Sequence, residues 1–149
     1  MRKILLLLLL PVFSLSYGQG RATLDSLLNR LSNEYSNKED TSKVGLLYKI
    51  ALQCKRIRND SVTAYGRMAV ELADKLGGIF FEGMYLFRIG ELGYKGSMGY
   101  VMRALTLFEQ LDDKPHIAMV LDFIAGSYYN LEEYPQALVY FEQIGRAHV

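Results

Sequence analysis

The 149-residue chain is 50% hydrophobic and 22% charged, a composition typical of globular proteins that excludes wholesale disorder. Its length allows one domain or a short array of repeats, and its single cysteine excludes an internal disulfide or a multi-cysteine zinc site. With 17 basic and 16 acidic residues, the chain has no net basic charge of the kind that attracts nucleic acid.

The N-terminus has the pattern of a secretory signal peptide. A basic pair at residues 2–3 precedes an unbroken apolar run over residues 4–10, and small residues occupy the −3 and −1 positions, Ser16 and Gly18. The apolar run is too short to cross a bilayer, which takes about 20 residues. We therefore expect a signal peptide at residues 1–18 and an exported, periplasmic protein.

The rest of the chain shows the apolar spacing of helices and no long alternation with period two. Leu24, Leu27, Leu28 and Leu31 lie at i, i+3, i+4 and i+7, on one face of a first helix. The same spacing predicts six more helices, at residues 44–54, 61–76, 79–94, 101–111, 117–129 and 134–143. The predicted fold class is all-α.

Turn and capping residues separate these helices. Asn59-Asp60-Ser61 is a capping cluster, and Gly77-Gly78 ends the helix that follows it. Four glycines, with Lys95 and Ser97, lie within residues 90–99. Their order does not match a phosphate-binding loop, and no predicted strand precedes them, so they indicate a turn between paired helices.

The residues that could carry chemistry do not form a catalytic set. Cys54 lies on an apolar helix stripe and is predicted to be buried, whereas His116 lies at a helix start and is predicted to be exposed without a base nearby. The acidic pairs at residues 112–113 and 132–133 are predicted to be solvated caps. We therefore expect no catalytic residue, metal site or cofactor in this segment, and no enzyme activity.

An internal repeat is the most informative feature of the sequence. Residues 69–78 recur 35 positions later as residues 104–113, each copy reading Ala, aliphatic, any residue, Leu, apolar, acidic, polar, Leu and two turn residues. A partial third copy begins at Ala137-Leu138 and includes Phe141. Repeats of this length are typical of stacked helical hairpins.

The most complete unit resembles the tetratricopeptide repeat (TPR). The residues that carry the resemblance are Leu121, Ile124, Ala125 and Tyr128 on one helix and Tyr134, Ala137, Leu138 and Phe141 on the next. Ala125 stands where the family usually has Gly. The earlier units depart further, with Val62 and Ser97 in the first small-residue position and Arg88 where an aromatic residue is usual.

This resemblance implies a right-handed superhelical array of antiparallel helix pairs that binds other proteins. It implies a helix and linker at residues 19–40, followed by repeats at residues 41–77, 78–114 and 115–143. The first helix of each pair would line the concave, partner-binding side, where the candidate residues are Tyr48, Lys49, Lys55, Tyr85, Arg88, Asp122 and Ser127. The expected partner is a protein, a peptide or the protein's own downstream segment, and not nucleic acid.

More narrowly, the chain is similar to the exported repeat regions of Bacteroidetes-type signalling proteins. Such proteins continue into a transmembrane helix and then a histidine kinase or a helix-turn-helix domain. We therefore expect the periplasmic sensory or scaffold part of a longer protein. The alternatives are the N-terminal fragment of a sensor histidine kinase or membrane-bound regulator, tethered to the inner membrane by its missing part, and a free-standing periplasmic scaffold.

The last six residues, 144–149, can be encoded by a nucleotide sequence that resembles the start of a common sequencing-library adapter. We therefore expect a non-native tail, with the natural chain continuing differently after Gln143. Because a repeat buries its outer face only against the next repeat, we expect Leu138 and Phe141 to be exposed. This exposure predicts a marginally stable, aggregation-prone protein.

Overall fold

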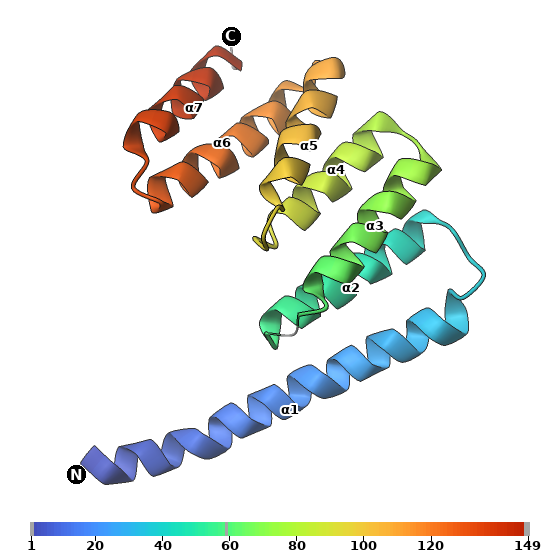
Figure 1. The fold of residues 1–149 in the computed structure, drawn as a ribbon, viewed down its shortest axis with the longest axis vertical. Helices are drawn as coiled ribbons and strands as arrows, with labels where there is room; N and C mark the ends of the chain where they lie inside the picture. The colour runs from blue at the N-terminus through green and yellow to red at the C-terminus, as the bar shows by residue number, and fades with distance from the viewer. Residues whose placement is uncertain (1, 59, 148–149) are drawn as a thin grey trace. The chain divides into compact units, whose positions relative to one another are not determined.

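The computed structural model describes the backbone of residues 2–58 and 60–147 and the side chains of residues 18–58 and 60–145. Within these residues the chain forms seven α-helices and no strand, which confirms the predicted all-α class (Figure 1). The helices are α1 (Arg2–Glu34), α2 (Thr41–Arg56), α3 (Val62–Leu76), α4 (Ile79–Gly90), α5 (Met98–Gln110), α6 (Lys114–Asn130) and α7 (Tyr134–Ala147). Asn59 of the predicted capping cluster and His148 lie outside the described residues.

The chain divides into two compact units, Met1–Leu72 and Ala73–Val149. The first unit contains α1, α2 and most of α3. The second contains the last turn of α3 and the helices α4 to α7. Each unit has its own buried residues and is described by itself.

In the first unit, α1 packs against α2. Leu24 of α1 is buried with Leu46, Ile50 and Cys54 of α2 in one apolar cluster. The predicted burial of Cys54 is confirmed, and burial raises the pKa of its thiol above the ordinary value. At the N-terminus of α2, the carboxylate of Asp40 accepts a hydrogen bond from the Lys43 backbone N–H at 2.9 Å.

The two helices approach each other closely at Gly20. The side-chain amide of Gln53 donates a hydrogen bond to the Gly20 carbonyl at 2.8 Å. A Cβ atom at residue 20 would lie 2.7 Å from Cγ2 of Ile57, so the close approach depends on the missing side chain.

Helix α1 runs without a break through the predicted cleavage site after Gly18. Within the part of the chain that the structure describes, none of the helices is both long enough and apolar enough to cross a membrane.

The second unit consists of two helical hairpins. Helix α4 packs against α5 and α6 against α7, and α5 also contacts α6 (Figure 1). Phe108 of α5 is fully buried. Its ring packs against Phe80 of α4, with centroids 6.1 Å apart, and stacks on His116 of α6 at 4.9 Å. This one side chain therefore links three of the four helices.

Glycines with positive φ lie in the turns after α3 and α4, as the sequence predicts, whereas the positive-φ residues after α2, α5 and α6 are Arg58, Asp112 and Glu132. Gly77 (φ 72°) and Gly78 (φ 92°) follow α3, and Gly93 (φ 67°) and Gly96 (φ 87°) lie in the turn between α4 and α5. Helix α4 ends at Gly90, four residues before the predicted end at residue 94.

Helix α4 ends early because the chain must turn for α5 to pack back onto α4. At Gly90 the α4 backbone lies directly against Val101 of α5, and a Cβ atom there would lie 2.2 Å from Cγ2 of Val101. The turn then buries Leu92 beside the hairpin although it lies outside both helices. Apolar spacing alone therefore extended the predicted helix too far.

The repeated alanines are buried. Ala104 of α5 and Ala137 of α7 are 0% and 2% exposed, as expected for small residues where helices pack closely. The predicted exposure at the last helix is also confirmed, because Leu138 is 58% exposed and Phe141 42%. Helix α7 continues through Gln143 to Ala147 without a break.

The contact at Gly90 predicts the effect of one methyl group. Gly90→Ala should lower the free energy of unfolding by about 1–3 kcal/mol, because the β-branched and buried Val101 cannot move aside freely. Gly99→Ala is the matched control. It lies in α5 with open space around its Cβ position and should raise stability by about 0.5–1 kcal/mol. Equal effects in denaturant unfolding would contradict the close packing of α4 and α5.

Candidate partner-binding surface

All seven candidate residues lie on the first helix of a predicted pair. Tyr48, Lys49 and Lys55 lie on α2, in the first unit. Tyr48 is half-buried, and the two lysines are exposed. The other four, on α4 and α6, belong to the second unit and are described separately.

In the second unit, the two first helices contact each other. Phe87 of α4 and Phe123 of α6 meet edge to face, with ring centroids 5.6 Å apart and an interplanar angle of 85°. Phe87 is buried and Phe123 is half-buried. Two of the candidate residues are neighbours of this pair in sequence, since Arg88 follows Phe87 and Asp122 precedes Phe123.

Tyr85 and Arg88 supply polar groups on α4. The Tyr85 ring packs edge-on against Phe81, with centroids 4.7 Å apart. Burial raises the pKa of the Tyr85 phenol, and the nearby charge of Arg88 opposes this shift only in part. The phenol therefore remains protonated at neutral pH and can donate a hydrogen bond, while the exposed Arg88 provides a cation.

The two candidate residues on α6 differ in exposure and in hydrogen bonding. Asp122 is exposed. Ser127 is half-buried, and its hydroxyl donates a hydrogen bond to the Phe123 carbonyl at 2.8 Å. The Ser127 donor is therefore used within its own helix, and Asp122 is the stronger candidate for contact with a partner.

The residues that carry the TPR resemblance fall into a buried and a less buried group. Leu121, Ile124, Ala125 and Ala137 are buried. Tyr128 is half-buried and stacks on Tyr140 of α7, with centroids 5.5 Å apart and an interplanar angle of 9°. Tyr134 is exposed but contacts the Tyr129 ring at 5.4 Å. Leu138 and Phe141 of α7 are exposed.

The prediction for His116 was wrong. The imidazole is half-buried, stacked on Phe108 and edge-on to Phe80 at 5.0 Å. It is also paired, because its Nδ1 lies 2.9 Å from the Asp113 carboxylate. Sequence reasoning missed this pair although the residues are three apart, because it considered Asp113 only as a helix cap.

Asp113 also caps α6, as predicted for that acidic pair. Its carboxylate accepts the His116 backbone N–H at 3.3 Å while its second oxygen contacts the imidazole. The hydrogen bond from the imidazole lowers the pKa of the Asp113 carboxyl below its ordinary value. Asp113 therefore fixes both the start of α6 and the position of the ring that covers Phe108.

A second charged cluster in this unit was not predicted. Arg103 of α5 forms ion pairs with Asp74, at 2.7 Å, and with the buried Glu82 of α4. These partners are 29 and 21 residues away in sequence, so the spacing of residues within one helix cannot predict the ion pairs. The cluster satisfies the buried carboxylate and ties α5 to α4 and to the end of α3.

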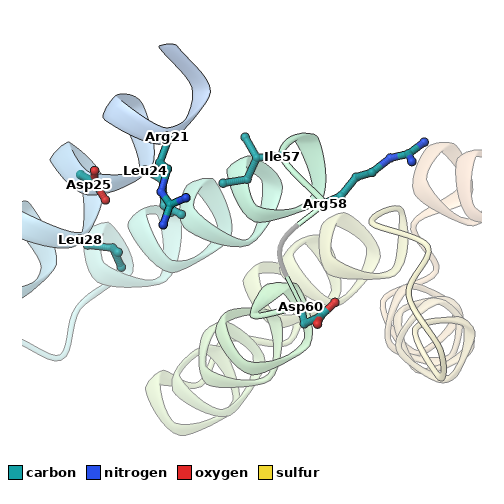
Figure 2. Close-up of a pocket in the computed structure, with 7 residues that line it drawn as sticks. All are labelled: Arg21, Leu24, Asp25, Leu28, Ile57, Arg58 and Asp60. Carbon is teal, nitrogen blue, oxygen red and sulfur yellow. The ribbon is translucent and has the colours of Figure 1, made fainter. Parts of the chain in front are cut away.

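The first unit contains a pocket of about 480 Å³ that the sequence did not indicate (Figure 2). Leu24, Leu28 and Ile57 form its apolar lining, and Arg21, Asp25, Arg58 and Asp60 supply its charges. Two cations and two anions give the pocket no net charge, and Figure 2 shows the Arg58 side chain extending away from the α1 residues. These features do not select one class of ligand.

Among the described residues, no three His, Cys, Asp or Glu side chains are grouped closely enough to hold a metal ion. No protein-family model, curated protein or solved structure matches the chain.

The Asp113–His116 pair predicts a specific pH dependence. Because the folded-state pKa of Asp113 is depressed, its stabilisation is present above the unfolded-state pKa and is lost as the pH falls through the folded-state value. Asp113→Asn should therefore lower the free energy of unfolding by about 1 kcal/mol at neutral pH and by less near pH 3.

Asp112→Asn is the matched control, since it removes the same charge from a neighbouring exposed residue that does not cap α6. Its effect should be small at both pH values. Denaturant unfolding at the two pH values gives the comparison. Parallel pH profiles for the wild-type chain and Asp113→Asn would show that the pair does not stabilise the fold.

Proposed function

We propose that this chain is an exported, TPR-like protein-interaction module that holds a segment of a partner protein against its first helices. The observation that carries the proposal is the contact between Phe87 and Phe123. It joins the first helices of consecutive hairpins, and this supports treating Tyr85, Arg88 and Asp122 on those helices as parts of one proposed surface. The right-handed superhelix and the periplasmic scaffold or sensory role are parts of the same proposal.

The repeated architecture supports the interaction module. Two hairpins, α4/α5 and α6/α7, follow one another, and corresponding alanines, Ala104 and Ala137, are buried in both. Stacked hairpins of this kind present an extended surface that suits peptides and helices better than small molecules.

The side chains on the α4/α6 surface indicate the partner's chemistry. A protonated tyrosine and an arginine are residue types enriched at protein interfaces. Arg88 and Asp122 add charges of opposite sign, so the proposed partner segment carries both an acidic and a basic residue beside apolar ones. The near-neutral charge of the chain supports a protein partner over nucleic acid.

The reactive side chains also support binding over catalysis. The Cys54 thiol is buried and its pKa is raised, which keeps it protonated and poorly nucleophilic. The His116 imidazole is held between two phenylalanine rings and a carboxylate that caps a helix. Both groups stabilise the fold.

Site-specific photocrosslinking in cells that naturally produce the protein tests this function. Benzoylphenylalanine placed at Tyr85 or at Asp122 should give the same discrete adduct on irradiation, recovered from the periplasmic fraction. The same label at Met102, which is exposed on the second helix α5, is the matched control and should give none.

Three results would contradict the proposal in different ways. Absence of an adduct from both first-helix positions would contradict the binding surface. Equal adducts from Met102 would show nonspecific contact. An adduct confined to the cytoplasmic fraction would contradict export while leaving the surface intact.

A further inference from the structure

The residue after the predicted cleavage site is a glutamine. Cleavage after Gly18 would make Gln19 the first residue of the exported chain. An N-terminal glutamine carries an amine and a side-chain amide on the same residue, and their reaction closes a five-membered lactam ring. The reaction requires a chain end, because in the uncleaved protein the nitrogen of Gln19 is part of a peptide bond.

The structure leaves the side chain of Gln19 accessible for this reaction. Gln19 is exposed. Its backbone carbonyl accepts a hydrogen bond from the Thr23 hydroxyl at 2.9 Å, a contact that uses neither the backbone nitrogen nor the side-chain amide. Once the bond to Gly18 is cut, the new amine and the amide can therefore meet in solvent.

Cleavage at this position would also place a positive charge where a helix disfavours it. The mature α1 would begin at Gln19, and the unpaired N–H groups of a first helical turn carry a partial positive charge. A protonated amine adds a like charge, and residues 19–22 contain Arg21 but no acidic side chain to offset it. Formation of the lactam removes the charge of the amine and with it this repulsion.

The contacts beside the new terminus hold α1 against α2. The Gly20 carbonyl accepts the hydrogen bond from the Gln53 amide at 2.8 Å, and residue 20 has no room for a side chain beside Ile57. An aminopeptidase that removed two residues from a free N-terminus would remove this contact. A lactam has no primary amine for such an enzyme to recognise, so ring closure would preserve the contact.

We propose that Gln19 is a modification site, at which the mature chain closes its N-terminus as pyroglutamate. The amine nitrogen of Gln19 attacks its own Cδ, the N–Cδ bond forms, the Cδ–Nε2 bond breaks, and ammonia leaves with a proton from the amine. The reaction needs no oxidant, cofactor or second substrate. It rests on the export proposed above and specifies the chemical state of the exported N-terminus.

Mass spectrometry of the protein purified from the periplasmic fraction of cells that naturally produce it tests this modification. After cleavage with a glutamate-specific protease, the N-terminal peptide should span residues 19–34. It should be lighter than the unmodified peptide by one ammonia, about 17 Da. A synthetic peptide of the same sequence with a free N-terminal glutamine, carried through the same handling, should remain largely uncyclised.

Gln19→Asn is the matched control variant. It keeps the amide but shortens the side chain by one methylene, so ring closure would require a strained four-membered ring. The mature variant should therefore keep a free amine. Incubated with an aminopeptidase, it should lose N-terminal residues at least several-fold faster than the wild-type chain.

Four outcomes would count against the proposal. A mature chain that begins with unmodified Gln19 would overturn it and leave export intact. A chain that retains residues 1–18 would overturn the cleavage as well. Equal cyclisation of the synthetic peptide would assign the lactam to handling, and equal trimming of wild type and Gln19→Asn would contradict the protection of α1. None of these outcomes depends on crosslinking at Tyr85 or Asp122.

Discussion

Phe108 is the side chain on which the packing of the second unit most depends. It is fully buried on α5, in contact with Phe80 of α4 and stacked on His116 of α6. The ring also fills the space beside Gly83, where a Cβ atom would lie 3.1 Å from it. A helical hairpin cannot bury its outer face alone, and Phe108 shows how the next hairpin buries it here.

Stacking of the hairpins through Phe108 also positions the proposed binding surface. With α6 held against α5, the first helices α4 and α6 meet at Phe87 and Phe123. The exposed Arg88 and Asp122 lie next to those rings in the chain. The packing on the second-helix side and the proposed surface on the first-helix side thus depend on the same arrangement of hairpins.

Much of the fold could be predicted because its signals are local. Apolar spacing gave the seven helices, and Gly77 and Gly78 marked a helix end, since positive φ angles favour glycine. The burial of Cys54 followed from its position on an apolar stripe. The end of α4 was misplaced because it depends on contact between Gly90 and Val101, which spacing within α4 does not encode.

The features that were missed depend on tertiary contacts. Arg103 meets Asp74 and Glu82 only when α5 folds back, and the environment of His116 depends on Phe80 and Phe108, from two other helices. The first-helix surface remains a prediction. Its residues were selected from a resemblance, and the structure adds the contact between Phe87 and Phe123 that unites those on α4 and α6.

The most direct test of this account compares two phenylalanines at equivalent repeat positions. The free energy of unfolding should fall by about 3–5 kcal/mol in Phe108→Ala, because that ring is enclosed by α4 and α6. In Phe141→Ala it should fall by less than about 1 kcal/mol, since α7 leaves that ring exposed. Similar losses in the two variants would contradict the stacking through Phe108 and the open face on α7.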